Sequence, residues 1–353
     1  GVQSCIVFNN TRLHAWHDRG DTVVGRRRAA APWPRARLRR MSEPAEPGAP
    51  SSPPSADVAP SRGDEARKGL LVFFAVVALG SGVFQGLLLR SGKPIGESPW
   101  LVYGLMWTPG VASIVARLVF REGFRDVSFR IGGSAGWKAI GFGWLLPPVL
   151  GSVVYGLAWA TGLAGFHVPA LADVGLSALG QPARFATLLG ISLTLVSAIS
   201  LVSAAGEEIG WRGYLLTRLI EAEVPRPVLV SSLVWALWHL PLIVSGQYAA
   251  GPNRVLSAAV FVATVVGMGF TLAFLRLSTG SVWPAIVLHG VWNAVIQGAF
   301  DVSTREPSIW VGEAGLLVAA ASLAVAWVLV RKGFAARRTP REEPFATVPG
   351  FAG

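Results

Sequence analysis

The sequence is poor in cysteine and in charged residues, and both shortages narrow the class of protein. Cys5 is the single cysteine, which excludes an intrachain disulfide framework and any multi-cysteine zinc or iron–sulfur site. Charged residues make up only 14% of the chain, against 52% hydrophobic residues and a mean hydropathy of +0.50. Such a composition excludes an ordinary soluble domain of this length and predicts a membrane protein.

Two common catalytic patterns are also missing. The chain has no His-Glu-x-x-His pattern and no Gly-rich phosphate-binding loop ending in Gly-Lys-Ser/Thr. Zinc-protease and nucleotide-binding functions therefore lose their usual support. Any metal would need histidine and carboxylate ligands.

The positive charge is concentrated at the start of the chain. Residues 1–40 hold nine arginines against Asp18 and Asp21, and they lead into Met41. We expect Met41 to be the native start and residues 1–40 to lie outside the native protein. Residues 1–69 as a whole are predicted to be a disordered, basic and proline-rich leader. The remaining positive charge fits arginines beside a membrane, so no nucleic-acid partner is expected.

The chain then alternates long apolar stretches with short polar loops over residues 70–330. The stretches approach the roughly 20 residues that a helix needs to cross the hydrocarbon core, and they are too uniformly apolar for barrel strands. We therefore predict an all-α membrane protein, a polytopic bundle of about eight transmembrane helices, followed by a basic cytoplasmic tail at 331–353. The spans are expected at 70–89, 100–120, 137–161, 185–205, 228–246, 255–275, 282–299 and 309–330.

Basic residues predict how this bundle lies in the cell membrane. With eight spans, most of them fall on one side, whereas the opposite loops, such as 162–184, are poorer in arginine and lysine. Because basic loops stay in the cytoplasm, both termini of this multi-pass protein are predicted to be cytoplasmic. The residues counted are Arg67, Lys68, Arg121, Arg125, Arg130, Arg212, Arg218, Arg226, Arg276, Arg331, Lys332, Arg337 and Arg338.

Adjacent glutamates at the predicted cytoplasmic end of the fourth span are the first candidate site. A charged side chain at a membrane helix centre costs roughly 2.5–3.5 kcal/mol, so its presence suggests function. Glu207 and Glu208 point about 100° apart on a helix, whereas Glu208 and Arg212 share a face. Arg212 can therefore neutralise Glu208 and leave Glu207 to take a proton from water. The alternative is a solvated helix end at the membrane interface.

Two histidines provide the other candidates. His239 lies in the fifth span, and His289 lies in the seventh span, four residues before Asn293 and therefore on the same face. The His289–Asn293 pair suits a water, a metal or a carbonyl oxygen, but equally an interhelical hydrogen bond worth about 1 kcal/mol. His239 alone is more typical of a packing residue.

The combination of these groups is more informative than any one of them. Carboxylates, histidines and an amide at matching depth in three helices are what water activation and oxyanion stabilisation require. Glu207, His239 and His289 are also candidate ligands for a divalent metal ion, which is the one cofactor left open.

These residues occur in three spaced motifs, and through them the sequence resembles the CPBP family of type II CAAX prenyl proteases and bacteriocin-processing (Abi) intramembrane proteases. The resemblance covers Met106 to Asn293. Trp235 stands where the family has phenylalanine, and we expect it to act as an aromatic wall and not as a proton donor. The motifs are Glu-Glu-x-x-x-Arg at Glu207, Glu208 and Arg212, Phe-x-x-x-His at Trp235 and His239, and His-x-x-x-Asn at His289 and Asn293.

The resemblance implies an intramembrane polar cavity, open to the cytoplasmic side, in which glutamate-activated water hydrolyses a peptide bond. It makes Glu207 the general base and His239 the residue that orients the water or shuttles its proton. His289 and Asn293 would stabilise the oxyanion. Glu208, Arg212 and Trp235 would support them. The implied partners are membrane lipid and a peptide or protein substrate, either lipidated or embedded in the membrane.

Two other functions are compatible with the sequence. A non-catalytic immunity or partner-binding membrane protein could use the polar cluster only to fix helix packing. A proton-coupled transporter could use the same residues as a relay. The transporter is disfavoured because the sequence shows no paired broken helices in two halves.

Overall fold

The computed structural model describes residues 62–170, 177–249, 251–305 and 308–337, with side chains as far as Lys332. Within these ranges the chain is helical, and its only extended pairing is an isolated bridge between Phe166 and Thr304. Most of the predicted leader and the end of the predicted tail lie outside the described residues. The first helix begins at Arg62, so residues 62–69 are helical and the predicted leader boundary is wrong there.

The helices follow one another with short connections. The 3₁₀ turns are η1 and η2, and the π-helical segments are η4, η5 and η6. In chain order the elements are α1 (Arg62–Ser91), η1 (Ile95–Glu97), α2 (Pro99–Phe120), η2 (Arg125–Val127), α3 (Gly133–Thr161), α4 (Gln181–Ile191), η4 (Ser192–Val196), α5 (Ser197–Gly210), η5 (Trp211–Leu215), α6 (Leu216–Glu221), α7 (Pro227–Ser245), α8 (Arg254–Thr279), α9 (Trp283–Trp292), η6 (Asn293–Asp301) and α10 (Leu316–Arg337).

Six helices in the described part of the chain are long and apolar enough to cross a membrane. They are α1, α2, α3, α7, α8 and the continuous run Gln181–Glu221. Helices also occupy the other two predicted positions, as α9 with η6 and as α10. The α9–η6 segment is less apolar because it carries His289, Asn293 and Gln297 at four-residue intervals. The all-helical fold of the described residues is thus confirmed, six of its helices fit membrane spans, and the total of eight spans stays a prediction.

The fourth helical segment extends well beyond its predicted end at residue 205. The run from Gln181 to Glu221 contains 41 residues, so Glu207 and Glu208 lie inside a helix and not at its cytoplasmic end. The helix continues because Arg212 pairs with Glu208, and because Trp211 and Tyr214 are fully buried. The π-helical segment η5 follows directly after α5, and π-helical turns inside α-helices often occur at functional sites.

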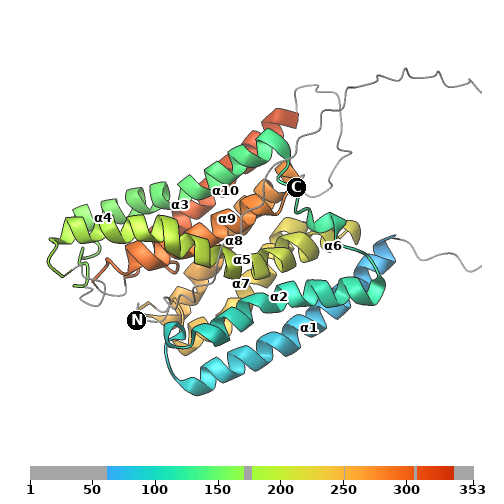
Figure 1. The fold of residues 1–353 in the computed structure, drawn as a ribbon, viewed down its shortest axis with the longest axis horizontal. Helices are drawn as coiled ribbons and strands as arrows, with labels where there is room; N and C mark the ends of the chain where they lie inside the picture. Colours follow the sequence, from blue (N-terminus) through green and yellow to red (C-terminus); the bar gives the residue numbers. More distant parts are fainter. Residues whose placement is uncertain (1–61, 171–176, 250, 306–307, 338–353) are drawn as a thin grey trace, which may run out of the picture. The chain divides into compact units, whose positions relative to one another are not determined.

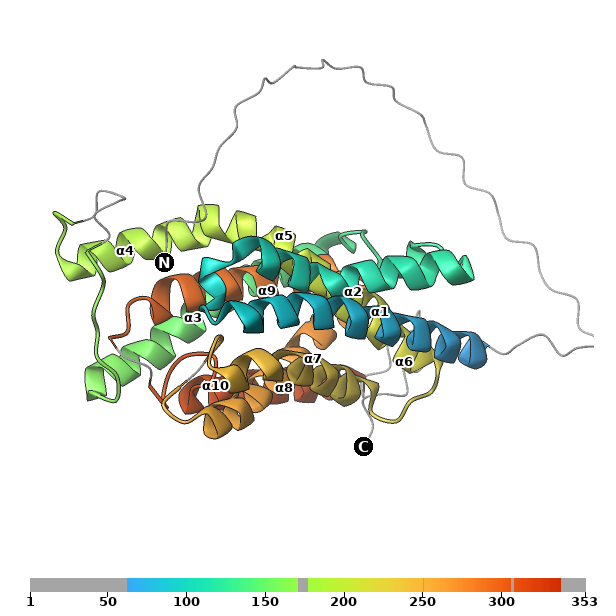
Figure 2. The same cartoon turned by 90° about the horizontal axis from the view of Figure 1, so that it is seen from below.

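Neighbouring helices pack in two connected groups (Figures 1 and 2). Helix α2 lies between α1 and α5, and α5 also contacts α9, which packs against α3. Helix α8 lies between α7 and α10 and contacts α9 as well. The helices α5, α7 and α9, which carry the predicted site residues, are therefore held by neighbours on several sides.

Glycines permit close contact beside the two glutamates. A Cβ added to Gly110 of α2 would lie 2.7 Å from the backbone oxygen of Gly206, and one on Gly210 would lie 2.3 Å from Cβ of Pro109. On the other side of α5, a Cβ on Gly290 would lie 3.0 Å from Cα of Leu201. Small residues of this kind let membrane helices approach closely. They bring α2 and α9 against α5 where Glu207 and Glu208 stand.

The last predicted span begins later than expected. Residues 309–315 form a loop, and α10 starts only at Leu316. Gly312 has a φ of +92°, which favours glycine, and the Leu316 and Leu317 amides donate back to the Ile309 and Trp310 carbonyls. The sequence prediction was wrong here because the loop residues are themselves apolar. The folded-back loop places Glu313 in the interior.

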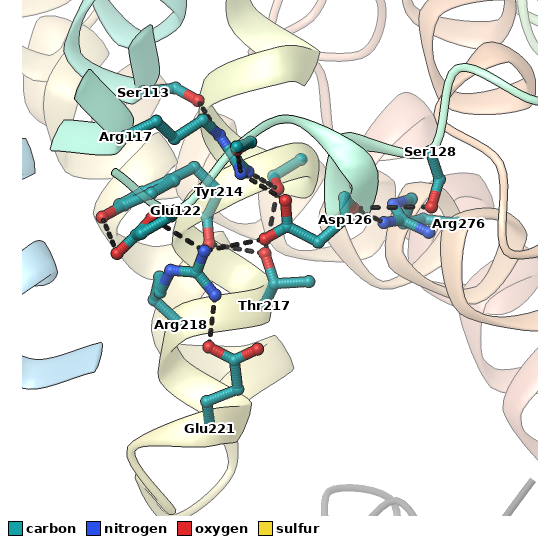
Figure 3. A network of polar contacts seen from close by, with 12 residues as sticks. Ser113, Arg117, Glu122, Asp126, Ser128, Tyr214, Thr217, Arg218, Glu221 and Arg276 are labelled. Atoms are coloured by element: carbon teal, nitrogen blue, oxygen red, sulfur yellow. Dashed lines mark hydrogen bonds and ion pairs between the residues drawn. The ribbon is translucent and has the colours of Figure 1, made fainter. Parts of the chain in front are cut away.

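A cluster of ion pairs fixes the loop between α2 and α3 (Figure 3). Arg117 bonds Asp126 and donates to the Gly213 carbonyl, Arg218 bonds Asp126 and Glu122, and Arg276 donates to the Asp126 carbonyl. Arg218 and Arg276, which were counted as loop cations in the orientation argument, are buried and used in packing. The orientation of the termini remains a prediction.

Candidate active site

The two adjacent glutamates of α5 are both buried and have different partners. One carboxylate oxygen of Glu208, Oε1, accepts a hydrogen bond from Arg212 at 2.9 Å and lies 2.8 Å from Nδ1 of His289. Glu208 and Arg212 are almost completely shielded from solvent. The structure thus places Glu208, Arg212 and His289 in one buried ionic group, with the Glu208–Arg212 pairing expected from their spacing.

Glu207 points to different neighbours. Its Oε2 accepts a hydrogen bond from Nε1 of Trp235 at 2.7 Å and another from Nε1 of Trp211 at 3.3 Å. Its side chain lines an internal cavity, whereas Glu208 is not among the lining residues. Two indole donors therefore hold one carboxylate oxygen of Glu207 at the cavity wall.

Trp235 does more than form an aromatic wall. Besides donating to Glu207, its ring lies 4.1 Å from the guanidinium carbon of Arg212 and 5.3 Å from the ring of His289. The expectation of an aromatic wall is incomplete, because the indole also has an N–H, absent from phenylalanine, that donates a hydrogen bond. Trp235 connects Glu207 to the Glu208–Arg212–His289 group.

His239 lies one helical turn after Trp235 and faces the same cavity. Its Nδ1 is 2.8 Å from the carbonyl oxygen of Trp235, and its ring packs against Trp238, Phe261 and Tyr248. A carbonyl can only accept a hydrogen bond, so Nδ1 carries a proton. In the neutral ring, Nε2 is then the free acceptor.

Asn293 begins η6, one turn after His289, and both side chains line the cavity. Oδ1 of Asn293 accepts a hydrogen bond from Nε2 of Gln297 at 3.4 Å. With its oxygen engaged, Asn293 has its amide NH₂ group left as a donor. Gln297 continues the four-residue spacing of His289 and Asn293, which is the signal that could have found it.

Glu313 was not predicted, because it comes from the loop before α10. Its Oε1 accepts from Trp292 at 2.8 Å, and its Oε2 accepts from Gln297 at 3.1 Å and from the Tyr248 hydroxyl. Burial, followed by the charge of Glu313, raises the pKa of Tyr248, so this phenol keeps its proton and donates. A hydrogen-bonded chain thus leads from Glu313 through Gln297 to Asn293.

The cavity between these helices, here called the inner cavity, has a volume of about 100 Å³, enough for several water molecules. Its lining residues from α2 are apolar, those from α8 are apolar apart from Thr264, and the ionisable and amide side chains come from α5, α7, α9, η6 and two loops. Its lining residues are Ile95, Val102, Leu105, Met106, Glu207, Trp235, Trp238, His239, Leu242, Tyr248, Phe261, Thr264, Val265, Met268, His289, Trp292, Asn293, Gln297 and Glu313.

A known family model matches part of the chain. Residues 188–295 match the family model of the type II CAAX prenyl endopeptidase Rce1-like proteins. The match confirms the predicted resemblance, and it contains all seven predicted site residues, from Glu207 to Asn293. No curated protein matches the chain. The helices α1, α2, α3 and α10 lie outside the matched Rce1-like region.

The inner cavity, lined by residues inside and outside the Rce1-like match, reaches one particular end of the bundle. Its loop residues, Ile95, Tyr248 and Glu313, come from the connections α1–α2, α7–α8 and η6–α10, which lie together at the end where α1 finishes (Figure 1). The basic loop between α2 and α3 is at the opposite end. The inner cavity thus approaches the end of the bundle opposite the basic α2–α3 loop (Figure 1), and the cytoplasmic placement of the termini and of the cavity opening both stay predictions.

The predicted metal ligands do not form a metal site in this arrangement. Among the described residues, no group of three or more His, Cys, Asp or Glu side chains is placed to hold a metal ion. Both histidines form their hydrogen bonds through Nδ1, His289 with Glu208 and His239 with the Trp235 carbonyl, so Nε2 of each ring is not used by these bonds. It is therefore only the placement of Glu207, His239 and His289 that gives no such three-residue group.

The buried carboxyl of Asp301, at the end of η6, should make the stability of the protein depend on pH. Burial raises the pKa of Asp301 to about 7, while the hydrogen bond from Tyr155 opposes this and the charge of Glu313 adds to it. A carboxyl whose folded-state pKa is raised stabilises the protein at low pH and loses that contribution as pH rises from about 4 to about 7. We expect the unfolding temperature in detergent to fall over this range.

Asp301→Asn provides the comparison, because an amide oxygen can still accept from Tyr155 and does not ionise. We expect its unfolding temperature to fall less between pH 5 and pH 8, by several degrees, than that of the wild type. Parallel curves for the two proteins would contradict the assignment to Asp301.

Proposed function

We propose that this chain is an intramembrane endopeptidase that hydrolyses a peptide bond with water activated by Glu207. The Rce1-like match supports a membrane protease, and the apolar helices fit a multi-pass membrane protein. The observation that carries the proposal is that the two adjacent glutamates have different surroundings. Glu208 is neutralised by Arg212, whereas Glu207 faces a cavity with room for water.

The reaction uses groups that face the inner cavity. A water oxygen attacks the carbonyl carbon of the scissile bond while Glu207 takes one proton from the water. The tetrahedral intermediate then collapses, the C–N bond breaks, and Glu207 returns the proton to the leaving nitrogen. Nε2 of His239 accepts a hydrogen bond from the attacking water and orients it.

His289 and Asn293 stabilise the oxyanion in this proposal. Asn293 donates through its amide, which Gln297 orients. Nδ1 of His289 faces Glu208, so an oxyanion contact through Nε2–H requires the doubly protonated ring, with Glu208 as its counter-ion. Preorganised donors of this kind are typically the largest contribution to acyl-transfer catalysis. Glu208 and Arg212 hold the donors and do not contact the substrate.

The same family includes non-catalytic members, so the test has to separate catalysis from packing. Purified protein in lipid is incubated with a panel of membrane proteins and lipopeptides, comparing wild type with Glu207→Gln, each with and without a chelator. Cleavage that is lost in the variant and retained with chelator supports the proposed hydrolysis. A chain that cleaves nothing, but still binds a partner in both forms, would be a non-catalytic membrane factor.

Replacing Trp235 with phenylalanine is expected to lower kcat by about 10- to 150-fold with little change in KM, because hydrogen bonds to charged groups are worth about 1.5–3 kcal/mol. The change removes the 2.7 Å donor to Glu207 and leaves an aromatic ring in place. Replacement by 3-benzothienylalanine, which has sulfur in place of N–H, isolates the hydrogen bond from the shape of the ring and its contact with Arg212.

Trp283 offers a matched control, because its Nε1 also donates at 2.7 Å, but to the Phe129 carbonyl, away from the inner cavity. The same two replacements at Trp283 should leave kcat unchanged. Equal kcat in the Trp235 and Trp283 variants would show that the indole N–H does not position Glu207.

A further inference from the structure

A second pocket continues from the inner cavity toward the loops. This outer pocket has a volume of about 450 Å³ and is formed mainly by the η6–α10 connection. Its polar lining includes Asp301, Arg305 and Ser308. It therefore differs from the inner cavity, whose α2 and α8 lining is apolar apart from Thr264.

The two spaces share part of their walls. Ile95, Tyr248, Gln297 and Glu313 line both. Three of these residues form the hydrogen-bonded group in which Glu313 accepts from Tyr248 and from Gln297. The boundary between the two spaces is thus polar, and Gln297 bonds directly to Asn293 at the proposed reaction centre.

A peptide that reaches Glu207 must satisfy the N–H and C=O groups on both sides of its scissile bond. Leaving such groups unpaired in an apolar environment costs several kcal/mol each. The inner cavity offers apolar contacts at Leu105, Val265 and Met268. The outer pocket offers carboxylates that accept from N–H groups, and Arg305, which can donate to carbonyl groups.

We propose that the outer pocket is the binding subsite for the polar flank of a peptide substrate whose adjoining apolar residue occupies the inner cavity. This inference rests on the proposed protease function and adds the class of substrate and its direction of entry. The substrate has an apolar residue near the scissile bond and a polar segment of a few residues that extends toward the α1–α2, α7–α8 and η6–α10 connections.

The test places a cysteine in the outer pocket. Ala314 lines this pocket and is half-buried, so Ala314→Cys is a small change. It is made in a Cys5→Ser background, in which it is the only thiol. A panel peptide that wild type cleaves is then compared with a truncated form lacking its polar flank. In an added Glu207→Gln background, where the peptide is not consumed, the full-length peptide should slow maleimide labelling of Cys at 314 severalfold, and the truncated form should not.

A bulky maleimide attached at position 314 should also lower kcat/KM for the full-length peptide by about tenfold or more, because its polar groups lose their partners. Ala183→Cys is the matched control, since Ala183 is exposed on α4 and lines neither space. The full-length peptide should not slow labelling at position 183, and a maleimide attached there should leave kcat/KM for that peptide unchanged.

Each result decides the inference. Cleavage by wild type, combined with labelling at 314 that no peptide slows and that does not reduce kcat/KM, would overturn the subsite and leave the protease function standing. If wild type cleaves no panel member, the proposed function fails, and the inference that rests on it fails too.

Discussion

Glu207→Gln is expected to lower kcat by about 10²- to 10⁴-fold, the range that a general base contributes. Glutamine has nearly the same size and keeps an oxygen that can accept from Trp235 and Trp211, the two donors to Glu207. It cannot take a proton from water. The fold should therefore persist, with KM and the unfolding temperature close to wild type.

The measurement is kcat and KM for a cleaved panel substrate, together with thermal unfolding in the same lipid or detergent. A loss of activity that accompanies a lower unfolding temperature would point to packing and not to catalysis. Wild-type kcat in a folded Glu207→Gln protein would remove Glu207 from the reaction.

Glu208→Ala is expected to have a different effect, although the residue is the immediate neighbour. It leaves Arg212 buried without its carboxylate partner, and breaking a buried ion pair in this way typically costs about 3–5 kcal/mol. The carboxylate oxygen that accepts a hydrogen bond from Nδ1 of His289 is lost as well. We expect a large fall in unfolding free energy and in the yield of folded protein, measured by denaturant unfolding in detergent.

The double variant Glu208→Ala/Arg212→Met provides the control. Removing both charges should recover much of the stability that the single change loses, because no unpaired charge remains. Activity should not return with it, since His289 still lacks its partner. Equal stability of Glu208→Ala and wild type would show that the pair does not hold the helix together.

The site could be predicted in part from sequence because helical spacing is local. The pairing of Glu208 with Arg212 depends only on a separation of four residues, and the structure shows it. The shared face of His289 and Asn293 follows from the same rule, and both line the inner cavity. The apolar lengths likewise placed the helices, with errors at their ends.

Other features depend on contacts between distant segments. Glu313 reaches Trp292 only because residues 309–315 fold back, and an apolar loop looks like the start of a helix in sequence. The bond from Trp235 to Glu207 depends on how α7 is rotated against α5. The end at which the inner cavity reaches the loops depends on three connections that are far apart in the chain.

The close contact of α2 with α5 has a consequence for genetic variation. Gly110, Gly206 and Gly210 carry no reactive group, yet a single added methyl at any of them would meet the opposing helix at 2.8 Å or less. Such alleles would displace the backbone that carries Glu207. Loss-of-function variants should therefore appear at these three glycines as readily as at the carboxylates, and a survey restricted to ionisable residues would overlook them.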